Sequence, residues 1–275
     1  MALTEFQREI CRLLADHRIA SGESYLPGAA TLNELIAAPR LSRDIDLFPH
    51  SGEALERSWE EDRRLLTEHG FVVSVVRERP SFVEAEVRRG AEVVLMQWAR
   101  DSAFCFFPLV VHDEFGLVLH PFDLATNKVL ALVGRLEVRD WIDVIESSRR
   151  LQPLGYLAWA APAKDAGFSP SSILEHASRS ARYSTEEIGA LSFQGDPPDA
   201  ATLAEEWHRL VDQASELHRI LPAAEVGTCV LNADGVLFNG GPVALRSALD
   251  EGKVLFHPGS LRGALPQLVE PGTST

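Results

Sequence analysis

The first 122 residues alternate between helical and strand-like patterns, and this alternation limits the possible folds more than any other feature of the sequence. Apolar residues recur at helical spacing after Thr4, and Gln7 stands three residues later as a capping-box partner. The next segments have the patterns of a strand, a helix, a strand and a helix, and then of three successive strands: 24–27, 29–37, 45–48, 53–69, 71–76, 82–87 and 91–98. We therefore expect an α/β (α+β) fold, with a mixed sheet and flanking helices.

The pattern changes at Asp123, after which helices dominate. Asp123 is expected to cap a helix that Gly134 ends, and a second helix is expected from about residue 139 to 150. Further helices are expected to begin near Ser169 and Ser184, and a last long one to span 200–220. Near the C-terminus, Ala233-Asp234-Gly235 between two short apolar runs predicts a β-hairpin. The sequence thus predicts three parts, residues 1–122, a helical part 123–222, and a hairpin with a tail, 223–275.

The overall charge and the cysteines exclude some classes of protein. A formal net charge of −14 argues against a protein coated in basic surface for binding nucleic acid, although it leaves room for a local basic cleft. The 3 cysteines are far apart, which predicts neither a disulfide framework nor a zinc motif. No secretory signal or membrane-length apolar run is evident, so we expect a cytoplasmic protein without a membrane partner.

Asp44 and Asp46 lie in the apolar segment Asp44-Ile45-Asp46-Leu47-Phe48. In a strand, residues two apart point to the same face, with Cα atoms roughly 6.6 Å apart. Two carboxylates placed so repel each other unless a cation lies between them, and Mg²⁺ prefers oxygen ligands of this kind. A short Asp-x-Asp also occurs by chance at solvated strand ends, so the pair by itself is weak support for a metal site.

Two upstream features strengthen the metal-site interpretation. Gly28 lies between a short strand and a helix, where a glycine lets phosphate approach the backbone, although a glycine there more often marks a turn. Ser42, two residues before Asp44, is a candidate to bond a triphosphate oxygen or merely to cap the start of the strand.

Two blocks of sequence resemble a known family. The first runs from Gly28-Ala29-Ala30-Thr31-Leu32-Asn33 to Arg40-Leu41-Ser42-Arg43-Asp44-Ile45-Asp46, and the second includes Thr126-Asn127-Lys128 and Arg139-Asp140-Trp141-Ile142-Asp143. In this order they are similar to the AbiEii/AbiGii toxin-like nucleotidyltransferases, which have the DNA polymerase β-type nucleotidyltransferase fold. The resemblance covers about residues 20 to 150, and it implies that 1–122 is the nucleotidyltransferase-like domain.

The resemblance implies a role for each matching residue. Asp44 and Asp46 would bind Mg²⁺ or Mn²⁺ and the nucleoside triphosphate, and Gly28, Ala29 and Ser42 would contact its phosphates. Lys128 would steady the triphosphate, Asp140 would orient Lys128 or assist the acceptor, and Asp143 shares that helix face. The family activity is transfer of a nucleotidyl group to tRNA or to a protein, as the toxin of a type IV toxin–antitoxin pair with a cognate antitoxin.

Simpler structural roles compete with these. Lys128 could instead be an ordinary surface lysine. Asp140 and Asp143 could instead be ion-pair partners of Arg135 or Arg139. A tRNA acceptor would need a local basic patch, for which the candidates are Arg12, Arg18, Arg40, Arg43, Arg88, Arg89, Arg135 and Arg139.

The sequence also departs from the family pattern. Gln97 stands where this fold usually has a third carboxylate, and glutamine cannot take a proton. Ala29 stands where the family often has Gly or Ser. Other acids, Glu84, Glu86, Glu92 and Asp101, are expected to face solvent or to lie too far along the chain. A nucleotide-binding protein without turnover and a transferase for small (antibiotic-type) acceptors are therefore alternatives.

Overall fold

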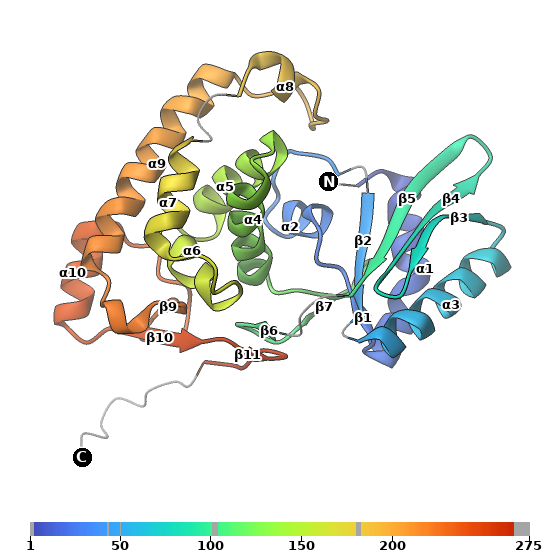
Figure 1. Cartoon of the computed structure of the whole chain (residues 1–275), viewed down its shortest axis with the longest axis horizontal. Coiled ribbons are helices and arrows are strands. Elements are labelled where there is room, and N and C mark those ends of the chain that lie inside the picture. The colour runs from blue at the N-terminus through green and yellow to red at the C-terminus, as the bar shows by residue number, and fades with distance from the viewer. Residues whose placement is uncertain (1–2, 43, 50, 101–103, 180–182, 267–275) are drawn as a thin grey trace. The chain divides into compact units, whose positions relative to one another are not determined.

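The computed structural model describes residues 3–42, 44–49, 51–100, 104–179 and 183–266, and of Asp44 only the backbone (Figure 1). The chain forms two compact units. Unit 1 consists of Met1–Ala103, Leu109–Leu124 and Ser192–Gly195, and unit 2 of Phe104–Pro108, Ala125–Leu191 and Asp196–Thr275.

Unit 1 is built around a five-stranded mixed sheet. Its elements are α1 (Glu5–Ser21), β1 (Ser24–Tyr25), α2 (Ala29–Leu35), β2 (Asp44–Pro49), α3 (Gly52–Glu68), β3 (Val72–Arg79), β4 (Phe82–Arg89), β5 (Glu92–Ala99), β7 (Val110–His112) and β8 (Gly116–Val118). The strand order is β1-β2-β5-β4-β3. Strand β2 runs parallel to β5, and the other neighbours are antiparallel. The predicted mixed sheet with flanking helices is confirmed.

The core of unit 1 is packed against one face of this sheet. Alternate residues of β4 and β5 are buried because a strand turns every second side chain to the same face, here Val83, Ala85, Val87, Val94, Met96 and Trp98. Helices α1 and α3 cover this face with apolar side chains such as Ile10, Leu14 and Leu55 in the same core cluster. The rings of Trp59 and Trp98 pack edge to face at 4.8 Å. We call the opposite face the polar face because Asp46, Glu84, Glu86 and Gln97 project from it.

The ends of the first helices follow the local signals in the sequence. Thr4 and Gln7 form the predicted capping box at the start of α1. Ser51 caps α3, whose end is followed by Gly70 at φ 81°, a conformation that glycine adopts without strain. Both helices therefore begin directly after a residue whose side chain caps them.

Unit 2 is mainly helical. Its elements are β6 (Phe104–Cys105), most of α4 (Pro121–Arg135), α5 (Val138–Arg150), α6 (Leu154–Ala160), η1 (Ala161–Ala163), α7 (Pro170–Arg179), α8 (Thr185–Gly189), α9 (Ala200–Ile220), η2 (Ala223–Glu225), β9 (Thr228–Asn232), α10 (Pro242–Asp250), β10 (Val254–Pro258) and β11 (Ser260–Leu261). Helices α6 and α9 pack closely, and Tyr156, Trp159 and Leu217 from this pair are almost fully buried. The predicted helical part is confirmed, and the predicted capping box of Ser184 and Glu187 opens α8.

The boundaries of α4 differ from the prediction. The helix begins at Pro121, so Asp123 lies inside its first turn instead of capping it. Proline suits the first position of a helix because its missing N–H needs no partner there. At the other end Gly134 lies within the helix, and the chain turns at Leu136, which has a φ of 55°.

The predicted turn near the C-terminus is present, with an additional strand. Gly235 has a φ of 76°, and backbone bonds from Asn232 N to Val236 O (2.8 Å) and from Phe238 N to Val230 O (3.0 Å) close the hairpin. The longer ladder, however, joins β9 to β10, which lies beyond α10. Pairing across a helix leaves no local signal, so the sequence pattern showed only the turn.

The remaining general expectations concern cysteines and membranes. Cys11, Cys105 and Cys229 are all buried. Burial raises the pKa of Cys11 to about 11. Within the described part of the chain, every helix is too short or too polar to cross a bilayer.

Candidate active site

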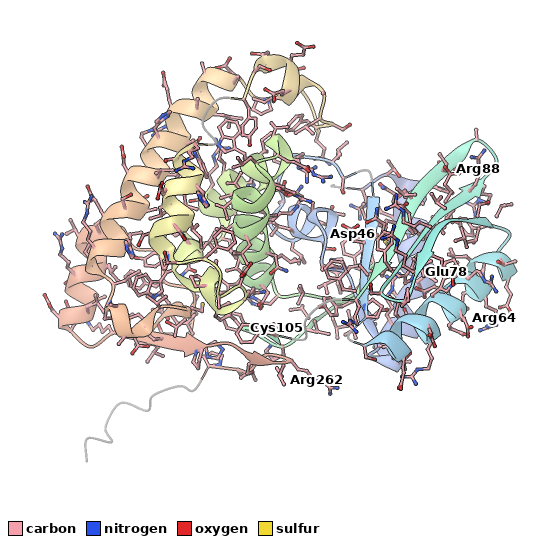
Figure 2. All side chains as sticks on the ribbon, viewed as in Figure 1. Asp46, Arg64, Glu78, Arg88, Cys105 and Arg262 are labelled. Carbon is pink, nitrogen blue, oxygen red and sulfur yellow. The ribbon has the colours of Figure 1, made fainter. Side chains whose placement is uncertain are left out.

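Asp46 lies in β2 of the unit 1 sheet (Figure 2). Its neighbours in β2, Ile45 and Leu47, are fully buried in the core, so the half-buried Asp46 projects from the opposite face. Asp44 is also in β2, two residues earlier, and its backbone pairs with Leu95. The side chain of Asp44 lies outside the described part of the structure, so the shared face of the two acids stays a prediction.

Gly28 is brought directly against Asp46. A Cβ atom on Gly28 would lie 2.8 Å from Asp46 Oδ2, closer than such contacts normally come. Gly28 precedes α2 in an extended conformation (φ −77°, ψ 178°) that any residue can adopt. Glycine here allows the backbone to approach Asp46 closely, and a larger residue would push the carboxylate aside. Ala29 is the first residue of α2 and is half-buried.

Ser42 lies in the segment that leads into β2. Gln7 Nε2 donates to its carbonyl oxygen (3.4 Å), and Asn33 Nδ2 donates to the carbonyl oxygen of Arg40 (3.1 Å). On its other side this segment receives the returning chain, with a bond from Leu41 N to Ser192 O (2.8 Å). Three separate parts of unit 1 therefore fix the path of the backbone just before Asp44.

Gln97 occupies the position next to Asp46 in the sheet. The parallel register of β2 and β5 pairs Asp46 with Gln97, and the antiparallel register of β4 and β5 pairs Gln97 with Glu84. Gln97 Nε2 donates a hydrogen bond of 2.8 Å to Glu84 Oε1. Glu84 is half-buried and projects from the face opposite the core. The alternation within β4 contains the signal, but only the register shows its partner.

Two oxygen donors lie side by side in this part of the sheet. Asp46 has a carboxylate and Gln97 an amide oxygen, and a hard divalent cation accepts both kinds of ligand. Among the side chains that the structure describes, no group of three or more His, Cys, Asp or Glu residues could hold a metal ion. The side chain of Asp44 is not among those described, so its binding of Mg²⁺ stays a prediction.

Lys128 and Asp140 meet in unit 2. Lys128 Nζ lies 3.1 Å from Asp140 Oδ1 and 3.0 Å from Asp143 Oδ2. Both carboxylates are fully buried, and the Lys128 side chain is 12% exposed, so Lys128 is not an ordinary surface lysine. The spacing of Asp140 and Asp143 on α5 brings both to the same cation of α4. Lys128 is therefore paired with two buried carboxylates at once.

Arg135 completes this cluster. It donates to Asp140 through Nε (2.6 Å) and a terminal nitrogen (2.9 Å), a bidentate arrangement. Burial works to raise the pKa of Asp140, but the hydrogen bond from Arg135 and the charges of Lys128 and Arg135 outweigh it, so this pKa is lower than usual. Asp140 thus stays ionised, and both the functional interpretation and the ion-pair alternative agree with its contacts.

Most of the arginines predicted for a basic patch are buried or form ion pairs. Arg18 and Arg40 are only 0% and 4% exposed, so the expectation that they contribute to a surface patch is wrong. Arg43 lies outside the described residues. The other candidates each form an ion pair: Arg12 with Glu114, Arg88 with Glu86, Arg89 with Glu9, Arg135 with Asp140, and Arg139 with Glu137.

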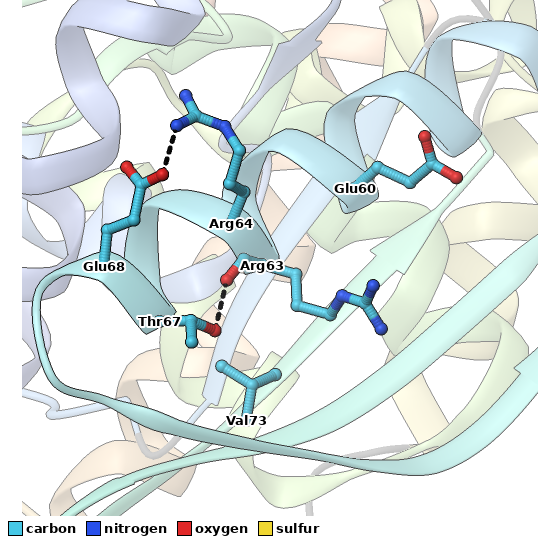
Figure 3. Close-up of a pocket in the computed structure, with 6 residues that line it drawn as sticks. All are labelled: Glu60, Arg63, Arg64, Thr67, Glu68 and Val73. Atoms are coloured by element: carbon cyan, nitrogen blue, oxygen red, sulfur yellow. Dashed lines mark hydrogen bonds and ion pairs between the residues drawn. The ribbon is translucent and has the colours of Figure 1, made fainter.

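A surface pocket of about 420 Å³ lies between α3 and β3 (Figure 3). Arg63, Thr67 and Val73 line it, together with Arg64, which forms ion pairs of 2.5 Å with Glu61 and Glu68. None of the predicted site residues contributes to this pocket. Its charges are already balanced within α3, so we assign it no function.

Comparisons with known proteins connect this geometry to a fold. No family model matches the chain, and no curated protein matches its sequence. Among solved structures, MenT4, a nucleotidyltransferase toxin from Mycobacterium tuberculosis, is 19% identical, with a TM-score of 0.53 over 80% of this chain and 83% of its own. The chain has a nucleotidyltransferase fold. JHP933 from Helicobacter pylori is 15% identical, with a TM-score of 0.48 over 79% of this chain and 95% of its own.

The comparison with MenT4 shows the fold of the chain and does not show its family. At such identities the comparison with MenT4 places the sheet and its flanking helices in the nucleotidyltransferase class. The narrower resemblance to the AbiEii/AbiGii group stays a prediction, as do the roles of the individual site residues.

Proposed function

We propose that this protein is a divalent-metal-dependent nucleotidyltransferase that moves a nucleotidyl group from a nucleoside triphosphate to an acceptor. The observation that carries the proposal is Asp46, which projects from the polar face of a nucleotidyltransferase-type sheet, against Gly28 and beside Gln97. Asp46 does not contribute to the apolar core, and the backbone at Gly28 comes close to its carboxylate.

The residues have distinct tasks in this proposal. Asp46, with Asp44, would hold Mg²⁺ or Mn²⁺, which supplies positive charge to the phosphates when bound. Gly28, Ala29 and Ser42 would border the phosphates. Transfer of this kind depends mainly on positioning and electrostatics, so it does not demand a strong general base.

We further propose that Lys128 supplies a cation to the triphosphate and that Asp140 orients it. The two ion pairs of Lys128 with Asp140 and Asp143 fix its ammonium group, and fixed charges act more strongly than mobile ones because they need no reorganisation. Asp140 stays ionised through its bonds to both cations, so it can perform this orienting task at neutral pH.

For the acceptor, we propose a protein hydroxyl ahead of tRNA. The net charge of −14 and the ion pairs of the candidate arginines both disfavour an RNA partner. The name of MenT4 includes the word toxin. We extend that role to this chain as a proposal, together with a cognate antitoxin as partner.

A second candidate function is nucleotide binding without turnover. Gln97 favours it, because an amide beside Asp46 adds an oxygen ligand but no base. Such a protein would bind nucleotide and metal through Asp46 and Gly28 and would release the nucleotide unchanged.

The test is a transfer assay with the full-length protein. Labelled nucleotides are incubated with Mg²⁺ or Mn²⁺ and with total tRNA, bacterial protein extract or aminoglycosides in separate reactions. Label in the protein fraction, or on the protein itself, that disappears in Asp46→Ala supports the proposal. Label in RNA would correct the acceptor, and label in an aminoglycoside would indicate the small-molecule alternative. Nucleotide binding that depends on Asp46 without transfer to any acceptor would favour the binding protein.

A further inference from the structure

Three polar side chains from neighbouring strands form one row across the polar face of unit 1. Asp46 of β2 is paired in register with Gln97 of β5, which is paired with Glu84 of β4. All three are half-buried. Their neighbours along the strands are fully buried in the core, so the three side chains project from the opposite face. These neighbours are Ile45, Leu47, Met96, Trp98 and Ala85.

The hydrogen bond between Gln97 and Glu84 fixes the orientation of the amide. An ionised carboxylate only accepts hydrogen bonds, so Glu84 requires the NH₂ end of Gln97, and Nε2 donates to it at 2.8 Å. The carbonyl oxygen of Gln97 is therefore the end that Glu84 leaves available. Without Glu84 the amide could turn over in the same space and present its NH₂ group instead.

We propose that Glu84 is a positioning residue that keeps the carbonyl oxygen of Gln97 available as an uncharged metal ligand beside Asp46. This inference rests on the function proposed above, because it concerns the same divalent cation. Mg²⁺ and Mn²⁺ accept amide oxygens as well as carboxylates. An amide whose NH₂ end faced the cation would repel it.

The pairing also explains why residue 97 is not an acid. A carboxylate at 97 would lie directly opposite Glu84 on the same face, and like charges in such a cross-strand pair are destabilising. With Glu84 in β4, glutamine is the residue at 97 that both satisfies Glu84 and offers an oxygen. Gln97 is in this view a partner matched to Glu84 and not a lost catalytic acid.

Exchanging the two residues provides a direct test. In the double variant Glu84→Gln with Gln97→Glu, the cross-strand hydrogen bond is kept with its direction reversed, and the carboxylate now lies beside Asp46. Mn²⁺ binding to the full chain is measured by electron paramagnetic resonance, with a non-hydrolysable nucleoside triphosphate present. Urea unfolding is measured on the same samples.

Glu84→Gln alone should weaken Mn²⁺ binding about 10-fold, a usual effect of losing a residue that orients a ligand. The double variant should bind Mn²⁺ at least as tightly as the wild type. Glu78→Gln removes an exposed carboxylate from β3 of the same sheet and should leave Mn²⁺ binding unchanged.

The outcomes separate this inference from the proposed function. If Mn²⁺ binding depends on Asp46 but Glu84→Gln changes only the unfolding free energy, the pair is a structural cross-strand contact and the inference is overturned. If Asp46→Ala binds Mn²⁺ as the wild type does, or if the wild type binds none, the proposed function fails and the inference fails with it.

Discussion

At the residue scale, Asp46 of unit 1 and Asp140 of unit 2 are each closely approached by other groups. The backbone at Gly28 lies against the Asp46 carboxylate, and Arg135 and Lys128 keep Asp140 ionised although it is fully buried. The two acids differ in environment, because Asp46 is half-buried on a sheet face whereas Asp140 is enclosed with two cations. Each environment leads to a separate prediction.

Gly28→Ala should weaken metal binding without unfolding the protein. The added Cβ would lie 2.8 Å from Asp46 Oδ2, and the carboxylate has to move away because it is the flexible partner. We expect about tenfold weaker Mn²⁺ binding, about 1.4 kcal/mol. Calorimetric titration measures it, with Gly52→Ala in α3 as the control because a Cβ there meets no atom within 4 Å. Equal Mn²⁺ affinity of Gly28→Ala and wild type would contradict the prediction.

Asp140 should make stability depend on pH in the acid range. Its pKa is lowered in the folded protein, so its stabilising contribution is present above the usual carboxylate pKa of about 3.9 and is lost as pH falls through the lower folded value. The unfolding free energy of the wild type should therefore exceed that of Asp140→Asn at pH 6, and the difference should shrink toward pH 3. Urea titrations at several pH values measure both proteins. A difference that stays constant with pH would contradict this.

At the scale of elements, helix pairs in unit 2 determine where its charges and its core lie. Helices α4 and α5 bring Lys128 and Arg135 to the acids of α5, and α6 packs against α9 through Gly155. A Cβ on Gly155 would lie 3.0 Å from the Cα of Ala214, so this approach depends on the absence of a side chain.

Replacing Lys128 should lower both transfer and stability. Lys128 neutralises two fully buried carboxylates, and removing one partner from a buried ion pair costs about 3–5 kcal/mol. We expect Lys128→Met to lose transfer activity and also to lower the urea midpoint. Arg135→Met is the comparison, since Arg135 also binds Asp140. If both variants lose transfer in proportion to stability, Lys128 has a structural role only.

Gly155→Ala should destabilise unit 2. Its Cβ would meet both the backbone of Ala214 and the Leu217 side chain, and overpacking of this kind costs about 1–3 kcal/mol. Urea unfolding followed by fluorescence measures the loss. Gly134→Ala, also in a helix of unit 2 but with open space around the new Cβ, should instead be neutral or slightly stabilising. Similar effects of the two substitutions would argue against close α6–α9 packing.

At the scale of the whole molecule, the net negative charge bears on whether a nucleic acid can bind. The chain carries −14 formal charges, and of the candidate arginines that are described, two are buried and five are paired with acids. Favourable binding to a polyanion requires unpaired cations that release its counterions. The charge of the molecule therefore disfavours a nucleic-acid partner.

Binding to tRNA should accordingly be weak. Fluorescence anisotropy with labelled total tRNA at about 150 mM salt should give no saturation at micromolar protein, because non-specific affinities lie at about 10⁻⁴–10⁻⁶ M even for proteins with basic surfaces. Tight binding with a steep salt dependence would contradict this prediction and would return tRNA to the place of preferred acceptor.

The sequence alone determined much of unit 1. The two-residue period of β2 turned Asp46 to the face opposite Ile45 and Leu47, and local rules also placed the capping boxes of α1 in unit 1 and of α8 in unit 2 correctly. These features depend on neighbours within a few residues, which the sequence displays directly. The three-part division of the chain and the roles of the site residues stay predictions.

Only the tertiary structure decided which distant residues meet. The register that sets Gln97 between Asp46 and Glu84 depends on how three strands assemble, and a shift of one residue would turn each side chain to the other face. Likewise the burial of Arg18 and the binding of Asp140 by both Lys128 and Arg135 follow from packing between helices. Sequence patterns record which way a side chain points, whereas its partners depend on contacts between segments that are far apart in the chain.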